Sequence, residues 1–121
     1  MKVLFQADAN LKPAVWRGLR RREPSIDFQG HIGVIPDSTS DLEVLHLAAH
    51  AGRILVSPDV RTMLANFQTF IATEQSPGLI LIPSSKTVSQ IIEALLLVWL
   101  YWSPEQLKNQ AIWLPGTDGP S

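Results

Sequence analysis

The stretch Ala49–Asp59, A-H-A-G-R-I-L-V-S-P-D, decides the fold of this chain. It contains the end of a helix, a glycine stop at Gly52, a short apolar strand over Ile54–Ser57, and an acid just beyond the strand. A strand that is apolar throughout suits a sheet covered on both faces, as parallel sheets are. Ligands of open α/β sheets bind outside the carboxyl ends of the strands. Asp59 is therefore expected at the edge where such folds place their chemistry.

Strand and helix patterns alternate on both sides of this stretch. Pro13 suits the first turn of a helix, and Ser40 with Glu43 forms a capping-box pattern at the start of another. Short apolar runs predict strands over 2–6, 25–28, 54–57 and 79–82, and 111–114 is either a fifth strand or a packed tail. Helices are expected over 12–22, from Ser40 to the Gly52 stop, over 59–73, and from 87 or 89 to 102, followed by one more helical turn at 103–105. The buried face of the second of these helices is expected to consist of Val44, Leu45, Leu47 and Ala48. This alternation predicts an α/β fold, a three-layer α/β/α sandwich with a mostly parallel central sheet.

Length and composition are those of one globular domain, assigned to residues 1–114, with a disordered tail over 115–121. The net charge of −1 gives no global field that would attract nucleic acid or membrane. No cysteine is present, which excludes disulfides and thiolate metal sites and fits a cytoplasmic protein. The N-terminus does not have the pattern of a signal peptide. The apolar run Ile91–Trp102 is shorter than the roughly 20 residues that a membrane-spanning helix needs, so no membrane is expected.

Three acids are predicted to meet at the carboxyl edge of the sheet. Asp8 follows the first strand, Asp59 follows the third, and Asp41 lies in the first turn of the helix before the third strand. Carboxylates gathered in one place repel each other unless a cation joins them. Oxygen ligands suit Mg²⁺ or Mn²⁺, which keep several waters and bind through a few carboxylates. The three acids are therefore candidate metal ligands and catalytic residues.

A structural interpretation of the same acids stays open. Asp41 would then complement the helix dipole, Asp59 would cap a helix after Pro58, and Asp8 would start a turn. Glu43 is excluded as a partner of Asp41, because two residues along a helix turn through roughly 200°.

Other features have a structural alternative as well. The run Arg17, Arg20, Arg21 and Arg22 could bind RNA phosphates, but such runs are more often solvated helix faces. His46 and His50 have a zinc-binding spacing, but no third ligand is evident. The helix over 91–102 carries more apolar side chains than one stripe requires, and it is therefore expected to meet a partner chain, in a homo-oligomer or a hetero-complex.

Three segments together resemble the small PIN-like domains of bacterial toxin–antitoxin type, relatives of the VapC ribonucleases. V-L-F-Q-A-D-A-N-L (Val3–Leu11) resembles the family's L-L-A-D-E-N-L, in which a strand ends in an acid. S-D-L-E-V-L-H-L-A-A-H-A-G-R-I-L-V-S-P-D (Ser40–Asp59) is similar to S-D-E-E-I-L-x-x-A-x-x-x-G-R-I-L-V-T-x-D, and S-P-G-L-I-L-I-P (Ser76–Pro83) to the P-G-V-I-L-I strand that follows. Order and spacing agree over about residues 2–100.

The resemblance implies a PIN-like fold and a Mg²⁺- or Mn²⁺-dependent ribonuclease site at Asp8, Asp41 and Asp59. The chain would be the toxin of a toxin–antitoxin pair, with RNA as substrate and an antitoxin protein as partner. Asn10 would position substrate or a metal-bound water, and Arg17 and Arg61 are further candidates for substrate binding.

The chain also departs from the family pattern. Ala9 stands where the family often has Glu, and Val60–Thr62 replaces the usual acid after Asp59. The alternative function is therefore a catalytically degenerate PIN-like module that acts by binding a partner through Leu97–Trp102. A third hypothesis, a phosphoacceptor receiver with Asp8, Asp59 and Lys86, fits less well. Receivers usually carry paired acids after the first strand and a longer gap before the lysine.

Overall fold

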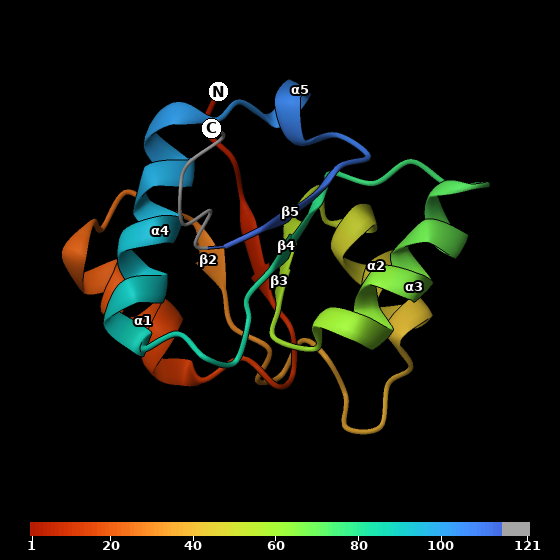
Figure 1. Cartoon of the computed structure of the whole chain (residues 1–121), viewed down its shortest axis with the longest axis horizontal. Helices are drawn as coiled ribbons and strands as arrows, with labels where there is room; N and C mark the ends of the chain where they lie inside the picture. Colours follow the sequence, from red (N-terminus) through yellow and green to blue (C-terminus); the bar gives the residue numbers. More distant parts are fainter. Residues whose placement is uncertain (115–121) are drawn as a thin grey trace.

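The computed structural model describes residues 1–114 (Figure 1), and the tail predicted to be disordered, 115–121, lies outside them. Strands and helices alternate along the chain, as the sequence predicts. The elements are β1 (Phe5–Ala7), α1 (Pro13–Arg22), β2 (Phe28–Gln29), α2 (Asp41–His50), β3 (Ile54–Ser57), α3 (Val60–Ile71), β4 (Leu79–Leu81), α4 (Val88–Tyr101), α5 (Pro104–Leu107) and β5 (Ala111–Trp113).

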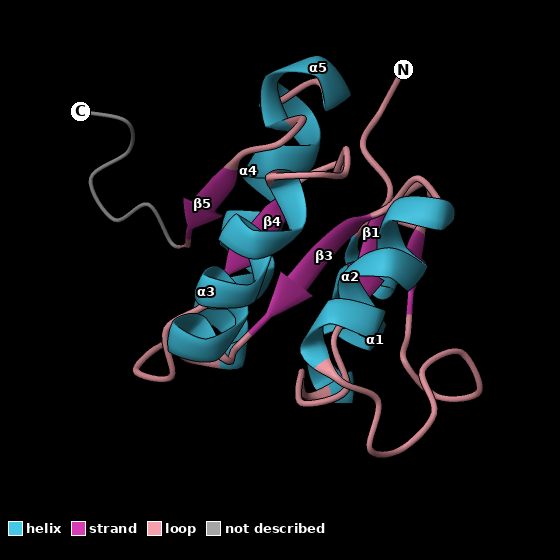
Figure 2. Ribbon diagram, turned by 90° about the vertical axis from the view of Figure 1, so that its right-hand side faces the viewer, coloured by secondary structure: helices cyan, strands magenta, loops and turns pink. Residues whose placement is uncertain are grey.

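The five strands form one sheet in the order β2-β1-β3-β4-β5, and every neighbouring pair is parallel. The predicted α/β fold class is confirmed, and the segment after α5 is a strand and not a packed tail. β1, β3 and β4 are the three inner strands, so β3 has a neighbour on each side. β2 and β5 form the edges of the sheet, and Figure 2 shows β5 at one margin of the molecule.

Helices cover both faces of the sheet, which gives three layers (Figure 1). Side chains alternate along β3, so Ile54 and Val56 face α1 and α4, whereas Leu55 faces α2 and α3. All three are buried, which explains why each of these positions is apolar. On the first of these faces, α1 and α4 bury Val15, Trp16, Leu19, Ile91, Leu95 and Val98. On the other face, α2 and α3 bury Val44, Leu45, Ala48, Met63, Phe67 and Phe70.

Helix ends follow the local signals. Ser40 caps α2 by accepting a hydrogen bond from the backbone N–H of Glu43 at 3.2 Å, and its hydroxyl donates to the Glu43 carboxylate at 3.0 Å. Thr87 and Gln90 form a complete capping box at the start of α4. Gly52 has a φ of +70°, the left-handed conformation expected of a helix stop.

Three expectations from the sequence are wrong in detail. The first strand is Phe5–Ala7, and not 2–6, because its pairing with β3 begins at Phe5. The second strand is Phe28–Gln29, and not 25–28, because Ile26 is still in a turn in which its N–H donates to the carbonyl of Glu23. Leu47, expected on the buried face of α2, is 40% exposed. Its neighbours Val44, Leu45 and Ala48 fill the contact with the sheet and α3 without it.

Within residues 1–114 no helix combines the length and the apolar character that a bilayer crossing requires.

Candidate functional site: a carboxylate edge of the sheet

Asp8 follows β1 directly, and the strand register places it beside Ser57. Ala7 pairs with Val56 in the parallel ladder, and the N–H of Asp8 donates to the carbonyl of Val56 at 3.0 Å. All the strands run in one direction, so the connections that follow β1, β3 and β4 lie together, at the bottom of Figure 1. This carboxyl edge contains Asp8, Asp41 and Asp59 together.

Asp8 is a buried carboxylate, with 3% of its surface exposed. Its Oδ2 accepts a 2.8 Å hydrogen bond from the Ser57 hydroxyl, and its Oδ1 accepts one of 2.8 Å from the N–H of Ala9. Burial raises the pKa of Asp8 above its ordinary value of 3.8, the two hydrogen bonds oppose this, and the charges of Asp59 and Asp41 raise it further. Both other acids are therefore close enough to affect the charge of Asp8. Asp8 also starts a turn, since its carbonyl accepts from the N–H of Leu11 at 3.0 Å.

Asp59 occupies the cap position of α3 but does not cap the helix with its side chain. Its Oδ2 accepts a 2.7 Å hydrogen bond from Nδ2 of Asn10, in the connection after β1. The backbone N–H of Asp59 donates to the Ser57 hydroxyl at 3.1 Å. Ser57 thus joins Asp59 to Asp8 through one oxygen atom, and Asn10 joins the two connections a second time.

Asp41 is the first residue of α2, one position after the capping Ser40. It therefore lies at the positive end of the helix dipole, as the structural interpretation expects. Its Oδ2 also accepts a 3.3 Å hydrogen bond from Nδ2 of Asn66, on the neighbouring helix α3. Asp41 is thus held from across the α2–α3 contact as well as by its own helix.

None of these carboxylates has a basic partner within the described part of the chain. The salt bridges there are Arg22–Glu93 and Arg53–Asp27. The Arg17–Arg22 run belongs to α1, which leads away from the carboxyl edge. Two of its members have structural contacts: Arg20 donates to the carbonyl of Phe28, and Arg22 pairs with Glu93. Arg17 is exposed on α1, and Arg61 is exposed in the first turn of α3, two residues after Asp59.

The donors at this edge suit a hard divalent cation in kind, because they are carboxylate and amide oxygens. Between Met1 and Leu114, however, no three His, Cys, Asp or Glu side chains are grouped closely enough to form a ready-made metal cage. Mg²⁺ does not require such a cage, since it commonly binds through one or two carboxylates and keeps several waters. The residues present therefore fit Mg²⁺ or Mn²⁺ held mainly by water.

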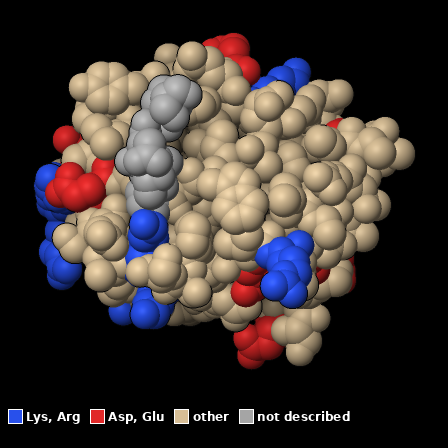
Figure 3. Space-filling view, in the orientation of Figure 1, with Lys and Arg blue, Asp and Glu red and all other residues tan. Residues whose placement is uncertain are grey.

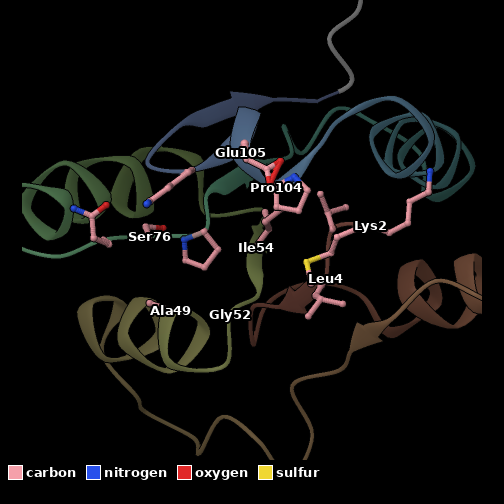
Figure 4. A pocket seen from close by; sticks show the side chains of 13 residues that line it. Lys2, Leu4, Ala49, Gly52, Ile54, Ser76, Pro104 and Glu105 are labelled. Atoms are coloured by element: carbon pink, nitrogen blue, oxygen red, sulfur yellow. The ribbon is translucent and has the colours of Figure 1, made fainter.

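Other candidates from the sequence lie elsewhere. The ring of His46 packs edge-on against Phe70, which gives it a packing role. His50 is the last residue of α2, at the end of the helix away from Asp41. A cavity of about 440 Å³ lies at the amino edge of the sheet, among Lys2, Leu4, Ile54, Ser76 and Glu105 (Figure 4). It is at the other end of the strands from the acids, so the two features are separate.

Sequence reasoning missed two residues of this edge. The sequence pattern predicts only a strand position for Ser57, although its hydroxyl links Asp8 and Asp59. A hydroxyl at the last position of an otherwise apolar strand was the signal that could have identified it. Asn66 was one of several polar residues of α3, and no local pattern distinguishes it.

Comparison of the chain with protein-family models, with curated proteins and with solved structures gave no match.

Proposed function

We propose that this chain is a metal-dependent ribonuclease of PIN-like type and the toxin component of a toxin–antitoxin pair. One observation carries the proposal: Asp8 is buried beside the charges of Asp41 and Asp59, and within residues 1–114 no basic side chain pairs with any of them. Uncompensated carboxylates at one edge are unfavourable for the protein alone, and a divalent cation would remove the penalty.

Asp8, Asp41 and Asp59 would hold Mg²⁺ or Mn²⁺. When bound, the ion supplies an activated water and neutralises charge on the phosphodiester. Ser57 keeps the Asp8 carboxylate in one orientation, and Asn10 does the same for Asp59. These neutral donors orient the acids without cancelling their charge.

Substrate contacts would come from the exposed cations near this edge. Arg61 lies in the first turn of α3, two residues after Asp59, and could bind a phosphate of the RNA backbone. Arg17 lies further along α1, where it could bind a more distant phosphate. Such contacts weaken as salt increases, so binding should decrease with ionic strength and Arg61→Ala should reduce the salt dependence.

The test is cleavage of labelled single-stranded RNA in the presence of Mn²⁺. We expect the wild-type chain to cleave and Asp8→Asn to be slower by at least about 100-fold, as expected when a metal ligand is lost. Asp37→Asn is the matched control, because Asp37 is an exposed acid of the loop before α2. Absence of cleavage by the wild-type chain, or equal cleavage by wild type and Asp8→Asn, would overturn the proposal.

A second candidate function is a non-catalytic interaction module of the same fold. The observation that favours it is the outer surface of α4, where Leu97, Leu100 and Tyr101 are 53%, 44% and 76% exposed. Figure 3 shows that the face of the molecule seen there carries few charged side chains away from its margins. Large apolar side chains clustered on one exposed helix are typical of a contact with another chain.

This candidate predicts a stable complex with a second copy or an antitoxin protein, together with no metal binding. Leu97→Ser with Tyr101→Ser should abolish the complex and leave the melting temperature unchanged, as measured by light scattering and circular dichroism. A wild-type chain that stays monomeric and forms no complex with the product of a neighbouring gene would eliminate the module.

A further inference from the structure

We infer that Asn66 is a positioning residue of the carboxylate edge, which orients Asp41 for a divalent cation. The inference rests on the proposed function, because it concerns the same site. It adds a residue from α3 that is not part of the three-acid set and that no sequence motif identifies.

The contact is direct and specific. Nδ2 of Asn66 donates to Oδ2 of Asp41 at 3.3 Å and to the carbonyl of Thr62, one turn earlier in α3, at 2.9 Å. The bond to Thr62 fixes the amide against its own helix. The bond to Asp41 then transmits that position to the first residue of α2, 25 residues away in sequence.

The location of Asn66 is unusual for a polar side chain. It is only partly exposed, and it lies at the margin of the α3 face that buries Met63, Phe67 and Phe70, from where it reaches Asp41 at the start of α2. Asn is a weak helix former, because its amide competes for backbone hydrogen bonds. An apolar residue would suit this seam between two helices better for packing alone. A role for the amide at Asp41 explains why the position is polar.

The arrangement repeats what is seen at the other two acids. Asp8 is held by the Ser57 hydroxyl and Asp59 by the Asn10 amide, so each of the three carboxylates has an uncharged donor. Asn66 contacts only Oδ2 of Asp41 and leaves Oδ1 for another ligand. Donors that hold the far side of a metal-binding carboxylate typically change metal affinity by about 10- to 100-fold when they are removed.

The experiment measures Mn²⁺ affinity of the full chain by calorimetry. We expect Asn66→Ala to weaken binding by about 10-fold or more. Thr69→Ala is the matched control, because Thr69 also donates to a carbonyl one turn earlier in α3, that of Ala65, but does not touch the acids. Its affinity should equal that of the wild type.

A double-mutant cycle separates positioning from a general effect on the fold. If Asn66 acts through Asp41, Asn66→Ala should cause no further loss in an Asp41→Ala background. A second measurement does not depend on an Asn66 variant. In the absence of metal, the side-chain amide NMR signals of Asn66 should differ in position between the wild-type chain and Asp41→Ala.

The outcomes are distinguishable. Wild-type protein that binds no Mn²⁺ would overturn the proposed function and this inference together. Wild-type binding with equal affinity for Asn66→Ala would overturn the inference alone, as would an equal further loss in the Asp41→Ala background. Amide signals of Asn66 that do not respond to Asp41→Ala would likewise overturn it.

Discussion

The hydroxyl of Ser57 donates a 2.8 Å hydrogen bond to Oδ2 of Asp8, although the two residues are 49 positions apart in sequence. The parallel pairing of β1 with β3 brings them side by side, and both are buried. The same hydroxyl accepts from the N–H of Asp59. The Ser57 hydroxyl thus contacts both Asp8 and the backbone of Asp59 at the carboxylate edge.

Replacing Asp8 by Asn should stabilise the protein at neutral pH. Burial raises the pKa of Asp8, followed by the charges of Asp59 and Asp41, so the folded state keeps this proton to higher pH than the unfolded chain does. The stability that the protonated form contributes is complete below the unfolded value of about 3.8 and is lost as the pH rises through the folded pKa. Asn cannot ionise and avoids that loss, so its melting temperature should exceed that of the wild type at pH 7.

The same pair of proteins supplies the control. Well below pH 3.8 the two melting temperatures should converge, since Asp8 is then protonated in both folded and unfolded chains. Added Mn²⁺ should stabilise the wild type and leave Asp8→Asn unchanged, because a ligand stabilises only the state that binds it. A variant less stable than wild type at pH 7 would mean that the turn at Asp8 depends on its carboxylate.

Ser57→Ala should destabilise the fold by about 1–3 kcal/mol, because the buried carboxylate of Asp8 and the N–H of Asp59 each lose a partner. The Ser57 bond lowers the pKa of Asp8, so its loss should raise that pKa further, as NMR titration would detect. Ser57→Thr keeps the hydroxyl and should restore both properties. Equal urea midpoints for the wild-type and Ala proteins would contradict the expectation.

Gly78→Ala should cost about 2 kcal/mol or more. A Cβ at this position would lie 2.6 Å from the carbonyl oxygen of Leu107, which is backbone and cannot move aside easily, and Gly78 has a φ of +131°. Gly33→Ala is the control for the backbone conformation, since Gly33 has a φ of +77° with nothing near its Cβ position, and it should cost about 1 kcal/mol. Urea unfolding of both variants tests the contact between β4 and the end of α5. Equal losses would show that steric overlap contributes nothing.

The two salt bridges, Arg53–Asp27 and Arg22–Glu93, should contribute unequally to the free energy of unfolding. Arg53 is only 16% exposed at its side chain and donates to the carbonyl of Phe5 at 3.1 Å and to Asp27 at 2.8 Å. Arg53→Ala should therefore cost about 1–3 kcal/mol, because a carbonyl at the amino edge loses its partner. Arg22→Ala removes the exposed pair with Glu93 and should not change the urea midpoint measurably. A midpoint shift that is as large for Arg22→Ala would contradict this ranking.

Much of the fold could be predicted from local patterns. The predicted strand Ile54–Ser57 has the same bounds as β3, and the stop at Gly52 is in the expected place. Alternation of elements was enough to predict the class, since parallel strands need helical crossovers. A strand boundary was predicted wrongly where a turn competes with the strand, as at Ile26. Burial was predicted wrongly at Leu47, where neighbouring side chains fill the contact without it.

The residues of the carboxylate edge could likewise be predicted only in part from the sequence. The sequence by itself determined that Asp8 and Asp59 end two strands and that Asp41 begins a helix, because periodicity reports where an element stops. Only the tertiary structure decided which donors hold them: Ser57 for Asp8, Asn10 for Asp59 and Asn66 for Asp41. Those contacts depend on the register of β1 against β3 and on the packing of α3 beside α2. Both are set by the whole core, whereas a local sequence pattern describes only the element that contains it.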